Sequence, residues 1–155
     1  MIRKNAWMSA AEITVLSGDG SQEAAALGRL LAQVSSRAAP LTAGRVRDVL
    51  RTPSTSVLVA RVDGEIVGMA LLLTLTTLSG DTGYVEEVVV DRAARGRHIS
   101  TALMTGLLEL AVRKGLRFVD LTSRPSRAAA NGLYRSLGFE LRETNCYRHH
   151  LGRTA

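Results

Sequence analysis

Aromatic residues and cysteine are scarce in this sequence of 155 residues. One Trp, three Tyr and two Phe are too few for the stacked aromatic surface on which proteins bind single-stranded nucleic acid. The single cysteine, Cys146, excludes an internal disulfide and a cysteine-rich zinc site. His149 and His150 stand together without a third ligand at useful spacing, so we expect no bound metal ion.

Long apolar segments are also missing. The longest uninterrupted apolar run, at 69–73, is five residues, whereas a membrane-spanning helix needs about 20. The first residues are charged and lack the apolar stretch of a secretory signal. We therefore expect a soluble, cytoplasmic protein with no membrane partner.

Basic residues outnumber acidic ones by 20 to 14, which gives a net charge of +6 and a pI near 10.4. Such a surface attracts anions, which could be nucleic acid, membrane phosphates or a phosphorylated cofactor. Basic charge is the only support for a nucleic-acid partner, so we expect none. The length favours one domain over residues 1–155, with ~68–70% of the unfolded chain's surface buried on folding.

The hydrophobic periodicity predicts a series of strands and helices. Three antiparallel strands in a row, linked by turns at 63–64 and 79–81, are the clearest feature of the pattern. Strands are predicted at 12–16, 57–62, 66–77, 84–90 and 118–121, and a hairpin at 140–151. Four helices are predicted. The first spans 21–36 with Ser21 as its N-cap, and a short second helix begins after Thr42 as its N-cap. The other two span 99–114 and about 125–138. This order predicts an α/β fold with a central mixed, mostly antiparallel sheet and helices on both faces.

A basic loop stands between the strand at 84–90 and the helix that follows. Arg92, Arg95 and Arg97 flank the predicted start of that helix. Backbone N–H groups at a helix N-terminus lack partners, and the helix dipole favours negative charge there. The loop therefore suits a pyrophosphate group, the alternative being a solvated basic loop.

A second motif covers residues 131–139. Asn131 and Tyr134 are three residues apart and share one helix face, while Leu133 and Leu137 share another. Gly138 suits the C-terminal exit of the helix. Asn131 and Tyr134 can thus face a site while the leucines pack, although a purely packing role for Tyr134 is the alternative.

Together these two segments resemble the GNAT superfamily of acyl-CoA-dependent N-acetyltransferases. Residues 88–100 resemble the family's strand, loop and helix for the CoA pyrophosphate, with Arg95 at the leading position. His98 stands where the family pattern has Gly, and Ser100 where it has Gly or Ala. Residues 131–139 resemble the family's closing motif, with its Asn, its Leu-Tyr pair and its Gly-Phe. The resemblance covers about residues 10–150 and implies a GNAT-like fold.

The resemblance implies that acetyl-CoA binds between the strands at 84–90 and 118–122. The residues that it assigns to CoA are Val88, Val89, Val90, Arg95, Gly96, Arg97, His98, Ile99, Ser100, Thr101, Ser123 and Asn131. The implied acceptor is a small-molecule amine or a peptide N-terminus. Two alternatives stay open: a specialised enzyme with another acyl donor, and a non-catalytic CoA-sensing or interaction protein. Trp7 could pack on the sheet or on a second copy of the chain, so a homodimer is also open.

The chemistry of amine acylation needs a base for the amine, a donor for the carbonyl oxygen and an acid for the leaving thiolate. Tyr134 is similar to the family's usual general acid. Backbone N–H groups at 88–90 are candidates for the oxyanion donor, and Glu86 or Glu87 for the base. Strand alternation places Glu86 with Val88 and Val90 on one face and Glu87 with Val89 on the other, and we prefer Glu86.

Overall fold

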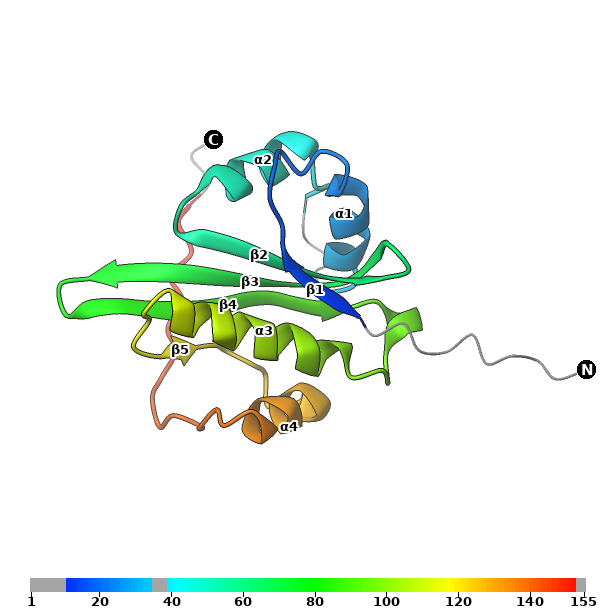
Figure 1. Ribbon diagram of the computed structural model, residues 1–155. Coiled ribbons are helices and arrows are strands. Elements are labelled where there is room, and N and C mark those ends of the chain that lie inside the picture. Colours follow the sequence, from blue (N-terminus) through cyan, green and yellow to red (C-terminus); the bar gives the residue numbers. More distant parts are fainter. Residues whose placement is uncertain (1–10, 35–38, 153–155) are drawn as a thin grey trace, which may run out of the picture. The chain divides into compact units, whose positions relative to one another are not determined.

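The computed structural model describes residues 11–34 and 39–152 as two compact units, one ending at Thr122 and one beginning at Ser123 (Figure 1). The first unit contains β1 (Glu12–Val15), α1 (Ala24–Ala32), α2 (Ala43–Arg51), β2 (Thr55–Val62), β3 (Glu65–Thr77), β4 (Gly80–Val90), η1 (Arg92–Ala94), α3 (Ile99–Arg113) and β5 (Val119–Asp120). The second contains α4 (Ala128–Ser136). A single domain over the whole chain stays a prediction.

The first unit is built on one five-stranded sheet in the order β1-β2-β3-β4-β5. The first four strands pair antiparallel, and β5 pairs parallel to β4. A parallel pair needs a crossover connection, which α3 supplies. The predicted mixed, mostly antiparallel sheet is confirmed.

Helices pack on both faces of this sheet. On one face, α1 and α2 cover a buried cluster that includes Leu30, Val59 and Met69. The neighbouring residue Gly68 points the other way, toward α3, and a Cβ there would lie 3.0 Å from Leu103 Cδ1. Because Gly68 has no side chain, α3 can lie close against the sheet at this point. The Leu103 side chain of α3 is fully buried there.

A side-chain cap marks the start of α2, but none marks the start of α1. Thr42 Oγ1 accepts a hydrogen bond from Arg45 N, which confirms the predicted N-cap of α2. The predicted N-cap Ser21 is wrong: its N–H and hydroxyl both donate to Asp19 Oδ1, at 3.0 and 2.6 Å. That local turn delays α1 to Ala24, and the helix ends at Ala32; the predicted end at 36 lies outside the described residues.

The predicted hairpin at 140–151 is wrong, because these residues form no strand. Leu141 and Leu151 are 95% and 86% exposed, so this segment buries no apolar face that could hold two strands together. Trp7, considered for a contact with a second copy, lies outside the described residues. No described helix is both long enough and apolar enough to cross a membrane.

Candidate functional site

A β-bulge interrupts β4 at the two candidate carboxylates. Leu71 pairs with Glu86 and Met69 pairs with Val89, so Glu87 and Val88 together face Ala70 alone. Glu87 accordingly has a left-handed backbone, with φ 52°. A bulge of this kind leaves one residue out of the hydrogen-bond ladder and re-aims the side chains around it.

The bulge overturns the predicted alternation along this strand. Residues that pair across a sheet point to the same face, and Met69 and Leu71 share a face of β3. Glu86 therefore shares a face with Val89, not with Val90. This is the face that α1 and α2 cover, because Met69 and Val89 belong to their buried cluster.

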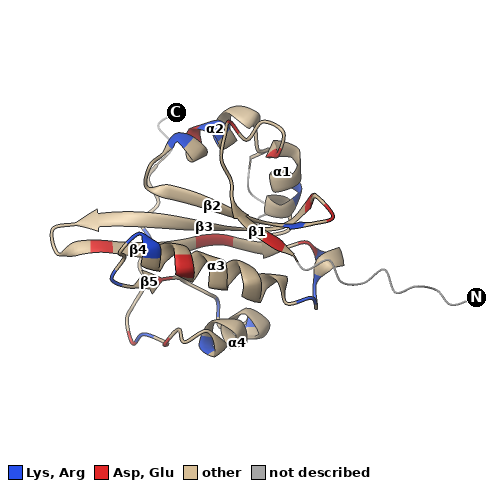
Figure 2. Ribbon diagram, viewed as in Figure 1, with Lys and Arg blue, Asp and Glu red and all other residues tan. Residues whose placement is uncertain are grey.

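Both carboxylates are exposed, and the fold shifts the pKa of Glu87. Desolvation raises the pKa of Glu87, and the neighbouring Glu86 carboxylate raises it further. Arg45 of α2 acts in the opposite direction on the same group. Figure 2 shows this acidic stretch on β4 and the basic residues that lead into α3.

The segment after β4 forms a tight turn ahead of α3. Asp91 caps η1 by accepting a hydrogen bond from Ala93 N at 2.9 Å. Gly96 and His98 both have positive φ, at 76° and 57°. For His98 this is the left-handed conformation that glycine adopts without cost.

The first turn of α3 suits a phosphate group. His98 precedes the helix and no side chain caps it, so the N–H groups of the first turn remain available to a ligand. The side chains of Arg95, Arg97 and His98 are exposed, and Ser100 and Thr101 are half-buried. The Ile99 side chain is 3% exposed and faces the core, so only its backbone could contact a ligand.

The two parallel strands separate soon after they meet. Only Gly83 with Val119 and Tyr84 with Asp120 pair, and the Tyr84 hydroxyl donates to Thr122 Oγ1 at 3.1 Å. Beyond Tyr84, β4 continues to Val90 without a partner among the described strands on that side. Its edge N–H and C=O groups are thus free to pair with an extended ligand arm.

The second unit holds the other predicted site residues. Asn131 Nδ2 donates to Arg124 O at 2.9 Å, which ties α4 to the turn before it. Tyr134 is 8% exposed and meets the Phe139 ring edge-on, with ring centroids 5.9 Å apart. Burial raises the pKa of Tyr134, against a smaller opposing effect of Arg127. The buried Ser123 hydroxyl has no hydrogen-bond partner among the described residues.

Sequence patterns gave no indication of Gln33, which follows the last residue of α1. Its Oε1 accepts a hydrogen bond from Arg92 N at 3.1 Å, and its Nε2 donates to Asp91 Oδ2 at 3.3 Å. These contacts join positions 58 and 59 residues apart, so no local motif could predict them.

Residues 29–139 match the family model described as the acetyltransferase (GNAT) family. The chain belongs to this family. The match includes the β4 bulge, the turn before α3, and α4 with Tyr134.

Individual GNAT relatives agree with this assignment. The chain is 31% identical over 86 residues to the L-2,4-diaminobutyric acid acetyltransferase of Marinococcus halophilus, covering 56% of this chain and 49% of the relative. It spans half or less of the curated relatives it matches. A Trypanosoma brucei acetyltransferase structure has a TM-score of 0.75 at 28% identity, over 91% of this chain and 100% of that one. An aminoglycoside acetyltransferase from an uncultured soil metagenomic sample shares the fold, with a TM-score of 0.82 at 19% identity over 92% and 97% of the two chains.

Proposed function

We propose that this protein is an N-acetyltransferase that moves an acetyl group from acetyl-CoA to a primary amine by direct attack. The observation that carries the proposal is the continuous segment of bulge, positive-φ turn and uncapped helix from Glu87 to Thr101. When bound, acetyl-CoA supplies a thioester carbonyl that an amine can attack. The chain's own residues must then bind the phosphates, stabilise charge on the carbonyl oxygen and move two protons.

The turn before α3 holds the pyrophosphate in this proposal. The N–H groups of residues 99–101 would donate to it, and Arg95 and Arg97 would neutralise its charge. Gly96, His98, Ser100 and Thr101 complete the turn and the first helical residues. The free edge of β4 at Val88, Val89 and Val90 would pair with the amide groups of the pantetheine arm.

The bulge supplies the donor for the carbonyl oxygen. Its extra residue puts one N–H near Val88 outside the β3–β4 ladder, where it can point at a ligand. Removing one such preorganised donor from an acyl-transfer site typically lowers kcat by about 10²–10³-fold.

The two proton transfers fall to Glu86 and Tyr134. Glu86 would accept the amine's proton, directly or through water, on the face that α1 and α2 cover. Tyr134 would donate a proton to the thiolate, and burial, which raises its pKa, favours the protonated phenol. Ser123 and Asn131 would help bind the cofactor from the loop and helix around Tyr134.

The acceptor class is a small-molecule amine or a peptide N-terminus. The diaminobutyric acid acetyltransferase named above takes its name from an amine-bearing small molecule, which favours the first. The net charge of +6 argues mildly against a polycationic acceptor. A cytoplasmic location and a homodimer stay predictions.

Release of CoA thiol from acetyl-CoA across an array of small amines and peptides tests the proposal. We expect release that depends on one class of amine. Tight CoA binding without release for any amine would favour a CoA-sensing protein instead.

A further inference from the structure

The amide of Gln33 connects the end of α1 to the start of the turn before α3. Its oxygen accepts from Arg92 N, and its nitrogen donates to the carboxylate of Asp91. The other oxygen of that carboxylate accepts from Ala93 N. Every donor in this set therefore meets an acceptor, and the first two residues of η1 are held by their backbone N–H groups.

We propose that Gln33 is a positioning residue for acetyl-CoA binding, acting through Asp91 and η1; this rests on the proposed function. η1 leads directly into Arg95, Gly96 and His98, the turn whose shape presents the first N–H groups of α3. His98 holds a left-handed backbone that costs energy, so this turn needs support from its surroundings. Gln33 gives that support from an element far away in the sequence.

The donor and acceptor pattern predicts how each substitution behaves. In Gln33→Glu the new carboxylate still accepts from Arg92 N, but its other oxygen lies against the carboxylate of Asp91. In Asp91→Asn the new amide faces two donors, Gln33 Nε2 and Ala93 N, but it has only one oxygen that can accept a hydrogen bond. Its own NH₂ group must therefore face one of these two donors, and that hydrogen bond is lost.

Combining the two substitutions restores every pair. The amide introduced at position 91 can turn its nitrogen toward position 33 and its oxygen toward Ala93 N. The carboxylate introduced at position 33 then accepts from that amide nitrogen and from Arg92 N. The direction of one hydrogen bond is reversed, and no donor or acceptor is left unmatched.

The experiment is calorimetric titration of the full chain with CoA and acetyl-CoA, together with acetyl-transfer kinetics. We expect Gln33→Ala, Gln33→Glu and Asp91→Asn each to weaken CoA binding about fivefold or more, as the loss of one to two hydrogen bonds implies. kcat at saturating acetyl-CoA should change less than about twofold, which places the effect in binding. The double variant Gln33→Glu/Asp91→Asn should return to within about twofold of the wild-type Kd.

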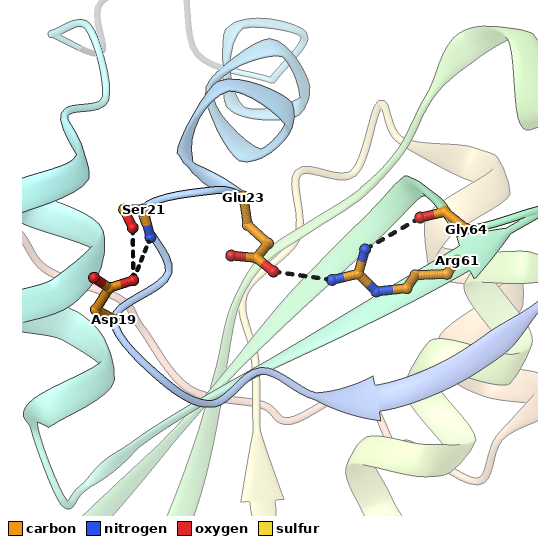
Figure 3. A network of polar contacts seen from close by, with 5 residues as sticks. All are labelled: Asp19, Ser21, Glu23, Arg61 and Gly64. Atoms are coloured by element: carbon orange, nitrogen blue, oxygen red, sulfur yellow. Dashed lines mark hydrogen bonds and ion pairs between the residues drawn. The ribbon is translucent and has the colours of Figure 1, made fainter.

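A matched control lies at the other end of the same helix. Glu23 immediately precedes α1 and pairs with Arg61 NH2 at 3.2 Å, and Arg61 also donates to Gly64 O (Figure 3). Glu23→Gln removes this ion pair without touching η1, so CoA affinity should not change. A loss equal to that of Gln33→Ala would mean that α1 acts only through general stability, which would overturn the specific role of Gln33.

Hydrogen exchange of the Arg92 and Ala93 amides, measured without ligand, provides a second reading. Both amides should exchange faster in Gln33→Ala than in the wild-type protein. In the double variant Gln33→Glu/Asp91→Asn, both should exchange at about the wild-type rate. If the wild-type protein binds no CoA, the proposed function fails and this inference fails with it. If the wild type binds and the Gln33 variants bind equally well, or the double variant shows no recovery, only the role of Gln33 is overturned.

Discussion

Glu86 lies opposite Leu71 in the β3–β4 pair, on the sheet face that carries α1 and α2. The bulge that follows turns the backbone at Glu87 to φ 52° and brings Val89 onto the same face. Two adjacent carboxylates thereby acquire different surroundings. The difference allows their roles to be separated by experiment.

We expect Glu86→Gln to lower kcat/KM by ~10²-fold and Glu87→Gln by less than about fivefold, since only the base takes part in proton transfer. The loss in Glu86→Gln should be largest at low pH, where more of the amine is protonated. Steady-state kinetics from pH 6 to pH 9 measure this. Equal, small losses of kcat/KM in both variants would show that neither Glu86 nor Glu87 is the base.

The raised pKa of Glu87 predicts that the effect of Glu87→Gln on the stability of the fold depends on pH. Its pKa is raised in the fold, so the ionised form is disfavoured there relative to the unfolded chain. Above the folded pKa, Glu87→Gln removes that disfavoured charge and should raise Tm slightly, by about 1 °C or less, because solvent screens the exposed side chain. As the pH falls below the unfolded pKa, Glu87 is protonated in both states and the gain should vanish. Thermal unfolding at pH 7.5 and pH 3.5 checks the sign, and an equal gain at both values would rule out charge as the cause.

Tyr134→Phe should lower kcat by ~10²-fold while changing CoA affinity little, because it removes only the proton donor. The edge-on contact with Phe139 needs no hydroxyl, so the variant should keep its fold. Since burial raises the pKa of Tyr134, wild-type activity should not fall through loss of this proton below about pH 10. Full activity in the variant would return Tyr134 to a packing role.

His98→Gly should tighten CoA binding by ~1 kcal/mol, roughly fivefold. The His98 backbone has φ 57°, so glycine fits the turn without strain and leaves more space for a phosphate. Arg92, Arg95 and Arg97 already supply positive charge, which makes an added imidazolium redundant. Calorimetric titration of the wild-type protein and of His98→Gly with CoA at pH 6 and pH 8 tests this prediction. If His98→Gly binds CoA more weakly than the wild type, and the loss is largest at pH 6, His98 is a phosphate ligand instead.

The sequence was sufficient to predict those features of the fold that depend on one short segment of the chain. The Thr42 cap, the antiparallel run of strands and the start of α3 after a basic loop follow from neighbouring residues and were predicted. Ser21 failed as a cap because Asp19, two residues earlier, holds it in a turn.

Features that depend on distant partners were missed. The bulge at Glu87 arises from the register with Met69 and Leu71, which strand alternation alone does not contain. The hairpin at 140–151 was predicted from composition, but strands need an apolar face to cover and these side chains are exposed. The contacts of Gln33 with Asp91 and Arg92 arise only from the packing of α1 beside η1.

Thermal unfolding with and without acetyl-CoA tests the central claim, that the turn before α3 binds this cofactor, most directly. At 100 times Kd a ligand that binds only the folded state adds ~2.7 kcal/mol, which should raise Tm by about 5–10 °C. Replacing both Arg95 and Arg97 by Ala should remove most of that increase while leaving the ligand-free Tm nearly unchanged, because both side chains are exposed. No increase in the wild-type protein at millimolar acetyl-CoA, or an undiminished increase in the double variant, would contradict the account.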